Sequence, residues 1–191
     1  MIIEKNINTK LGTTLLTYFS LIVLGSVILV LSAKTKVPFY PVPMTMQTFV
    51  IMLFGFIFGW KKACLIISAY LLEGAVGLPV FAGTPEKGIG LAYMTGPTGG
   101  YLLGFLFTAY LSGKLNFKTN LILRIVKLTL SVIPIYLIGC LWLGFIIGWD
   151  KPILSIGVLP FILAELFKIF LLALLIPRLV FSINLSRRSF R

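Results

Sequence analysis

The 191-residue chain is predicted to be an all-α integral membrane protein, one domain over residues 1–191 with six transmembrane helices. Hydrophobic residues make up 59% of the sequence and charged residues only 12%, and the mean hydropathy is +1.06. A soluble domain of this length cannot cover so much apolar surface. The apolar runs are long and do not alternate with polar residues, which favours helices over a β-barrel. We expect the spans at about residues 15–33, 45–60, 63–76, 97–112, 128–148 and 154–176.

The first three spans differ in length. The first is expected to be a retained helix, because its apolar stretch is too long for a signal peptide and Leu31 does not suit a cleavage after Ala33. The second and third reach only about 21–24 Å, less than the ~30 Å hydrocarbon core. Short spans usually border irregular segments that line a cavity inside a helical bundle.

Small residues recur every four positions in several spans, which allows another helix to approach closely. We interpret this spacing as packing within the bundle, with a partner interface as the alternative. The residues are Gly55 and Gly59 in the second span, Gly96, Gly100, Gly104, Thr108 and Ser112 in the fourth, and Cys140, Gly144 and Gly148 in the fifth.

The basic residues predict the orientation of the spans. The net charge of +12 does not indicate nucleic acid here, because the basic residues lie between apolar runs. Most of them precede the first span, follow the sixth, or separate the second from the third and the fourth from the fifth. The positive-inside rule then places both termini in the cytoplasm and the loops 34–44, 77–96 and 149–153 outside. These outer loops are rich in Pro, Gly and aromatic residues and are expected to cap a ligand pocket.

The sequence lacks the residues that metal binding, cofactor binding and ATP hydrolysis usually require. There is no His, and Cys64 and Cys140 are isolated cysteines, so we expect neither a metal site nor a cofactor. The stretch "SGKL" at 112–115 lacks the first Gly and the Ser or Thr of a phosphate-binding loop, so we expect no ATPase activity.

Two charged residues stand in the middle of the sixth span. Glu165 and Lys168 are three residues apart and so share one face of a helix. Charges at this depth usually face the protein interior or a wet cavity. Either they form a structural salt bridge, or they line a pocket and present an acceptor and a donor to a polar solute. Gln47, after an outer loop, and Tyr101, at the outer end of the fourth span, are further ligand-binding candidates.

Four segments together resemble the BioY family, the biotin-specific substrate-binding components of energy-coupling factor (ECF) transporters. They are "VPFYPVPMTMQTF", "GAVGLPVFAGT", "GPTGGYLLGF" and "LPFILAELFKIFLLALL", and the resemblance runs from about residue 20 to residue 177. It implies six helices with both termini inside and a ligand near the outer side. By motif, the family's ligand-binding residues fall on Gln47, Tyr101, Glu165 and Lys168. The family commonly has Gly-Asp where this chain has Ala164 and Glu165, so the carboxylate here reaches about one methylene further.

Biotin suits such a site because it has ureido N–H donors, a carbonyl acceptor, an apolar part and a carboxylate. Glu165 is expected to accept from a ureido N–H, and Lys168 to donate to the carbonyl or the carboxylate. Aromatic residues of the outer loops are expected to cover the apolar part: Phe39, Tyr40, Phe81 and Tyr93.

The resemblance also implies partners in the cytoplasmic membrane of a prokaryote: membrane lipid, a transmembrane coupling protein and two cytoplasmic ATPases. Small residues of the first span are the candidates for docking on the coupling protein: Gly25, Ser26, Ser32 and Ala33. Three alternatives stay open. They are a related component for another vitamin such as riboflavin or thiamine, a small intramembrane enzyme that uses Glu165 and Lys168, and a structural assembly subunit.

Overall fold

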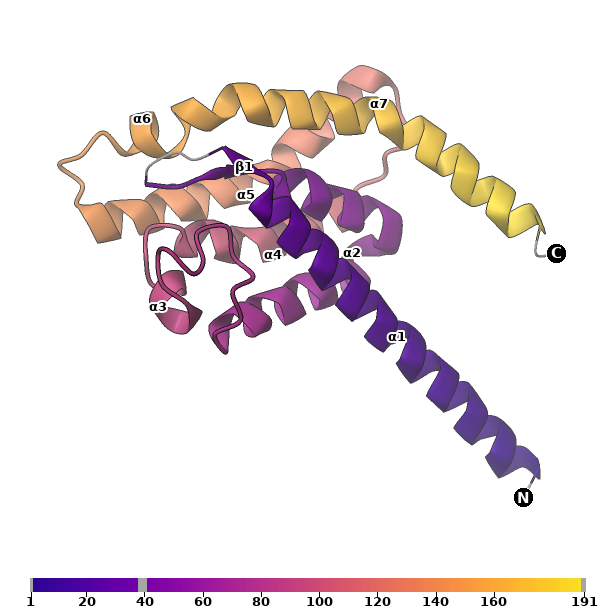
Figure 1. The fold of residues 1–191 in the computed structure, drawn as a ribbon. Helices are drawn as coiled ribbons and strands as arrows, with labels where there is room; N and C mark the ends of the chain where they lie inside the picture. Colours follow the sequence, from indigo (N-terminus) through magenta and orange to yellow (C-terminus); the bar gives the residue numbers. More distant parts are fainter. Residues whose placement is uncertain (1, 38–40, 190–191) are drawn as a thin grey trace.

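The computed structural model describes residues 2–37 and 41–189, and side chains over 14–36 and 41–181. Within these residues a helical bundle carries one short β-hairpin (Figure 1). The elements are α1 (Ile2–Lys34), β1 (Lys36–Val37), β2 (Met44–Thr45), α2 (Gln47–Ala75), α3 (Gly90–Met94), α4 (Gly99–Lys114), α5 (Leu121–Ile147), α6 (Ile153–Gly157) and α7 (Leu159–Ser189).

The predicted class, a helical membrane protein, is confirmed. In the described part of the chain, four stretches are long and apolar enough to cross a membrane: Thr14–Lys34, Gln47–Ala75, Leu121–Ile147 and Ile153–Phe181. Large apolar side chains such as Leu163 and Phe167 are exposed on the outside of the bundle, as a lipid solvent requires.

Helix α2 folds back on itself and so contains both the second and the third predicted spans. In a straight helix Gln47 and Tyr70, 23 residues apart, would lie about 34 Å from each other. Instead, Gln47 Nε2 lies 2.9 Å from the Tyr70 hydroxyl. The reversal occurs at Gly59, with φ 76° and ψ 166°, a conformation open to a residue without Cβ. Lys61 and Lys62, the basic residues between the two expected spans, lie in the first turn of the second leg.

Helix α4 packs against α2 and α5 through the small residues of the fourth predicted span. A Cβ at Gly104 would lie 2.5 Å from the Cα of Ile135, and one at Gly113, the neighbour of Ser112, would clash with the backbone N of Trp60. Such distances leave no room for a side chain, so backbone meets backbone at both faces of α4. For the fourth span, the interpretation of the small residues as packing within the bundle is therefore confirmed, whereas an added Cβ at Gly59 of the second span would meet nothing within 4 Å.

We expect Gly104→Leu to destabilise the protein by about 3 kcal/mol or more, because backbone rather than a flexible side chain blocks the added atoms. Thermal unfolding in detergent, followed by near-UV circular dichroism, measures this effect. The matched control is Leu103→Ala, at a neighbouring position that is 42% exposed. Equal melting temperatures for both variants would contradict the close packing of α4 on α5.

Two of the small residues of α1, Gly25 and Ser26, contact the second leg of α2. Gly25 lies against Ile66, the hydroxyl of Ser26 donates to the Glu73 carboxylate, and Ser32 and Ala33 are buried. These four residues, expected to dock on a partner, thus make contacts within the chain in this conformation. Small side chains are what allows α1 to approach α2 so closely.

The two ends of the bundle differ (Figure 1). The chain termini leave it at one end, while the β1–β2 hairpin, α3 and α6 gather at the other. The last predicted span is interrupted at Val158, which separates α6 from α7. Glu165 and Lys168 follow within the first turns of α7, so they lie near the end that carries the hairpin.

Candidate functional site

Glu165 and Lys168 meet inside the bundle. Their position one turn apart on α7 brings Lys168 Nζ to 2.8 Å from Glu165 Oε2. The two residues are only 5% and 6% exposed. A buried ion pair is stable only if further hydrogen bonds satisfy its remaining donors and acceptors, so the groups around it decide what the pair can do.

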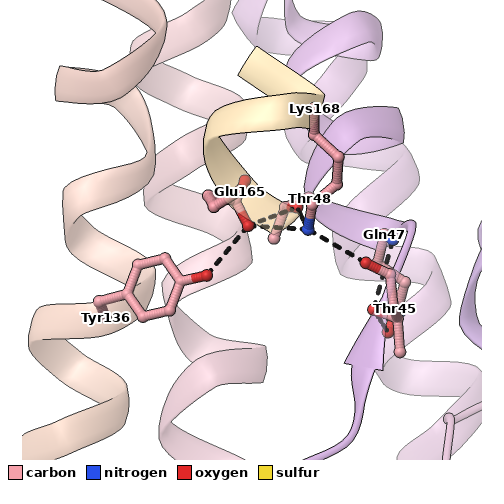
Figure 2. A network of polar contacts seen from close by, with 6 residues as sticks. All are labelled: Thr45, Gln47, Thr48, Tyr136, Glu165 and Lys168. Atoms are coloured by element: carbon pink, nitrogen blue, oxygen red, sulfur yellow. Dashed lines mark hydrogen bonds and ion pairs between the residues drawn. The ribbon is translucent and has the colours of Figure 1, made fainter. Parts of the chain in front are cut away.

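All three N–H groups of the Lys168 ammonium have acceptors in the protein (Figure 2). Besides Glu165, Nζ donates to Thr48 Oγ1 at 2.6 Å and to the Thr45 carbonyl at 3.1 Å. An ammonium has three donors and no acceptor. Lys168 is therefore saturated, and it joins α7 to the start of α2 and to β2.

The two oxygens of Glu165 differ sharply. Oε2 accepts from Lys168, from the Thr48 hydroxyl at 3.0 Å and from the Tyr136 hydroxyl at 2.9 Å. Oε1 is buried and has no hydrogen-bond partner among the described residues. A buried acceptor without a donor costs about 1–3 kcal/mol, and such a group is open to an N–H or O–H of a bound molecule.

A second polar cluster borders the first. The Gln47 side chain donates to the Tyr70 hydroxyl at 2.9 Å and accepts from the Thr45 hydroxyl at 3.2 Å. Tyr70 in turn donates to the Val80 carbonyl at 3.0 Å. A side-chain amide carries two N–H donors, so Gln47 retains one for another molecule.

Tyr101 is fixed by its hydroxyl, which donates to the Gly157 carbonyl on α6 at 3.0 Å. Its ring meets that of Tyr136 edge to face, with centroids 6.4 Å apart. Because the hydroxyl is held by the protein, the ring is the part that Tyr101 offers to a ligand.

A narrow cavity joins these groups, with about 60 Å³ open to the centres of water-sized molecules. All four residues predicted to bind a ligand line it: Gln47, Tyr101, Glu165 and Lys168. The predicted lid residue Tyr93 lines it too, whereas Phe81 stacks behind Tyr93 with ring centroids 5.2 Å apart. The other two predicted lid residues, Phe39 and Tyr40, lie outside the described residues.

Sequence reasoning missed three residues of the polar network around Glu165 and Lys168, namely Thr45, Thr48 and Tyr136. Thr48 follows Gln47 directly, and its position beside a candidate at the start of an apolar span was the available signal. Tyr136 stands in the middle of α5, at membrane depth. A tyrosine hydroxyl there needs a hydrogen-bond partner inside the protein, and this was the available signal.

Lysines join the region around the hairpin to the segment between α2 and α3, beside the cavity. From the end of α1, Lys34 Nζ donates to the carbonyls of Phe81 at 2.9 Å and Thr84 at 2.7 Å, and from β1, Lys36 Nζ donates to that of Ala82 at 2.6 Å. In the opposite direction, Lys87 Nζ donates to the Pro41 carbonyl at 3.2 Å. Since Ala82 itself lines the cavity, these bonds fix part of its roof.

To bind a small solute that carries N–H groups, a membrane protein needs a hydrogen-bond acceptor inside its apolar bundle and loops that cover the solute. The fold and the cavity thus define a solute-binding membrane protein. The chain belongs to the BioY family, whose family model matches residues 6–184.

Curated relatives match most of this chain. The probable biotin transporter BioY of Pyrococcus horikoshii is 36% identical over 153 residues, which cover 78% of this chain and 87% of the relative. The biotin transporter BioY of Thermotoga maritima is 35% identical, with 80% and 89% covered. Biotin transporter BioY2 of Lactococcus lactis subsp. cremoris is 32% identical, with 96% and 98% covered.

The fold also matches a solved structure. It is the crystal structure at 2.1 Å of the S-component for biotin from an ECF-type ABC transporter. The TM-score is 0.71 at 26% sequence identity, and the match covers 87% of this chain and 92% of the other.

Proposed function

We propose that this protein binds biotin and mediates its uptake across the membrane as the substrate-binding component of an ECF-type transporter. The relatives at 30% identity or more are named as biotin transporters, certain or probable, and the matched crystal structure is that of a biotin S-component. Membership of the BioY family supports the same function.

The free oxygen of Glu165 is the observation that carries the assignment to this cavity. Biotin has two ureido N–H groups, and one of them can donate to Oε1, which has no donor among the described residues. Lys168 is already saturated by Glu165, Thr48 and Thr45. We therefore assign it the role of holding the carboxylate in place, rather than that of a direct donor to the ligand.

The rest of the cavity suits the remainder of biotin. Aromatic side chains offer apolar contact to its ring system and chain: Tyr93, Tyr101, Phe105, Tyr136 and Phe161. The second N–H of Gln47 offers a donor to a ligand oxygen. A site that is apolar with a few directed polar groups is typical for small-molecule binding.

The transport step is assigned to partners. The chain belongs in the cytoplasmic membrane of a prokaryote, with both termini in the cytoplasm by the positive-inside rule and the cavity opening outward. A transmembrane coupling protein and two cytoplasmic ATPases of an ECF module would supply the energy. The face of α1 that carries Leu24 and Leu31 is exposed and is available for contact with the coupling protein.

Calorimetric titration of the purified protein in detergent with biotin tests the proposal. We expect one-to-one binding that riboflavin and thiamine do not displace, and unchanged biotin when the ligand is recovered. Displacement by another vitamin would assign the cavity to that vitamin, and a converted ligand would indicate an enzyme. Folded protein that binds none of the three would overturn the proposal.

We expect the double variant Lys34→Met/Lys36→Met to release biotin about tenfold faster, because bonds from charged donors that fix the roof are lost. Dissociation of labelled biotin, chased with unlabelled biotin, measures the rate. The control is Lys151→Met, since Lys151 is on the predicted outer side but pairs with Asp150 at 3.1 Å. An unchanged rate in the double variant would show that these lysines do not hold the site closed.

A further inference from the structure

A second hollow lies between α5 and α7, open toward the outside of the bundle. It is far larger than the ligand cavity, with about 880 Å³ open to the centres of water-sized molecules. Its walls are almost entirely apolar and include Val132, Leu137, Leu141, Leu154, Ile162 and Leu166. We call it the α5–α7 groove.

The groove lies at membrane depth, so hydrocarbon rather than water is the solvent at its mouth. Leu137 and Leu166, which line it, are 55% and 51% exposed. Along α5 the lining residues run from Thr129 to Leu141, which corresponds to about 18 Å at 1.5 Å per residue. One leaflet of the bilayer contributes about half of its ~30 Å hydrocarbon core, so the groove has the length of one acyl chain.

Basic residues lie near the Thr129 end of the groove. Arg124 Nη1 donates to the Ala173 carbonyl at 2.7 Å, so the guanidinium joins α5 to α7 about one turn beyond Thr129. Lys127 is on α5 within one turn of Arg124, and its Nζ donates to the Asn116 carbonyl at 2.6 Å; Lys118 stands in the segment just before α5. The sequence has no acidic residue from Lys87 to Trp149, so nothing in that stretch neutralises these charges. Basic sites at the ends of membrane helices attract anionic lipid headgroups.

Two residues belong to both the groove and the ligand cavity. Tyr136 and Glu165 line the one and the other, and the Tyr136 hydroxyl donates to Glu165 at 2.9 Å. A lipid chain in the groove would therefore contact Tyr136 and Glu165 from the side opposite the ligand cavity. It would fill the space behind the buried carboxylate on the side of the membrane.

We propose that the α5–α7 groove binds one anionic phospholipid, with an acyl chain along α5 and the phosphate at Arg124, Lys127 and Lys118. The length of the groove and its apolar lining select a lipid chain. The cluster of positive charge selects an anionic headgroup over a zwitterionic one. This site is separate from the one proposed for biotin, and its test does not depend on biotin binding.

Native mass spectrometry of the full chain tests the proposal, with detergent micelles that contain equal amounts of phosphatidylglycerol and phosphatidylcholine. We expect one retained phosphatidylglycerol per protein. In Lys118→Gln/Lys127→Gln, retention should fall about fivefold for each charge removed. Leu137→Trp fills the groove and should lower retention with all charges present.

Matched controls separate this site from general lipid contact. Lys114→Gln removes a cation that lies over Trp60 and Tyr110, and Leu163→Trp adds bulk at a lipid-facing position that is 81% exposed but does not line the groove. Both should retain phosphatidylglycerol as the wild type does. Equal retention of the two lipids, or no retained lipid, would overturn the proposal. So would a Leu137→Trp variant that is folded and retains lipid normally.

Discussion

Glu165→Ala is expected to weaken biotin binding by at least about 3 kcal/mol, a hundredfold or more in Kd. The variant removes the acceptor proposed for a ureido N–H and leaves the Lys168 ammonium buried without its carboxylate, which lies 2.8 Å away. Both losses act in a low-dielectric interior, where unpaired groups are costly. Calorimetry in the same detergent as the wild type gives the difference.

Two companion variants separate binding from folding. Glu165→Met/Lys168→Met removes both charges and the carboxylate acceptor at once, and apolar replacements of a buried pair are often tolerated by the fold. We expect it to melt close to the wild type and to bind biotin as weakly as Glu165→Ala. Glu165→Asp keeps the charge but withdraws it by one methylene, and should bind within about tenfold of the wild type. Full affinity in the doubly neutral variant would remove Glu165 from the site.

Lys168→Ala is expected to weaken biotin binding by about 2–3 kcal/mol, roughly 30- to 150-fold in Kd. The physical reason is indirect. Lys168 holds Glu165, Thr48 and the Thr45 carbonyl together, so its loss frees the carboxylate and the end of β2. Because a charged carboxylate is left with hydroxyl donors only, the melting temperature should fall as well.

Thr48→Val provides the control for that indirect role. It removes one of the three acceptors of Lys168 and one donor to Glu165 Oε2 but leaves the ion pair in place. We expect a loss of affinity smaller than that of Lys168→Ala. Wild-type affinity in Lys168→Ala would refute the assignment of the buried pair to the binding site.

The helical membrane class could be predicted from hydropathy alone, because lipid exposure requires long apolar helices. The turn between the legs of α2 could not. Hydropathy places the break at Lys61 and Lys62, whereas the backbone reverses at Gly59 through a positive φ. The partner of the small residues of α1 could not be predicted either, since residues such as Gly25 are equally suited to contact within a chain and between chains.

The four residues that side-chain chemistry and motifs assigned to ligand binding all line the cavity: Gln47, Tyr101, Glu165 and Lys168. The different hydrogen bonding of the two Glu165 oxygens could not be predicted from the sequence. It depends on Tyr136, 29 residues away, and Thr48, 117 residues away, and the sequence does not indicate which group a hydroxyl in an apolar span bonds to. The saturation of Lys168 likewise depends on a backbone carbonyl, which no side-chain pattern records.

The short β-hairpin bears on conformational entropy. β1 pairs with β2, the Thr45 carbonyl on β2 is bound by Lys168, and Lys36 on β1 is bound to the Ala82 carbonyl. Fixing the backbone of one residue costs about 1–2 kcal/mol at room temperature. Because both strands are already ordered in the folded chain, this entropy is not lost again when a ligand binds. A small ligand with few polar atoms can then bind tightly, because little of its interaction energy is consumed in ordering the protein around it.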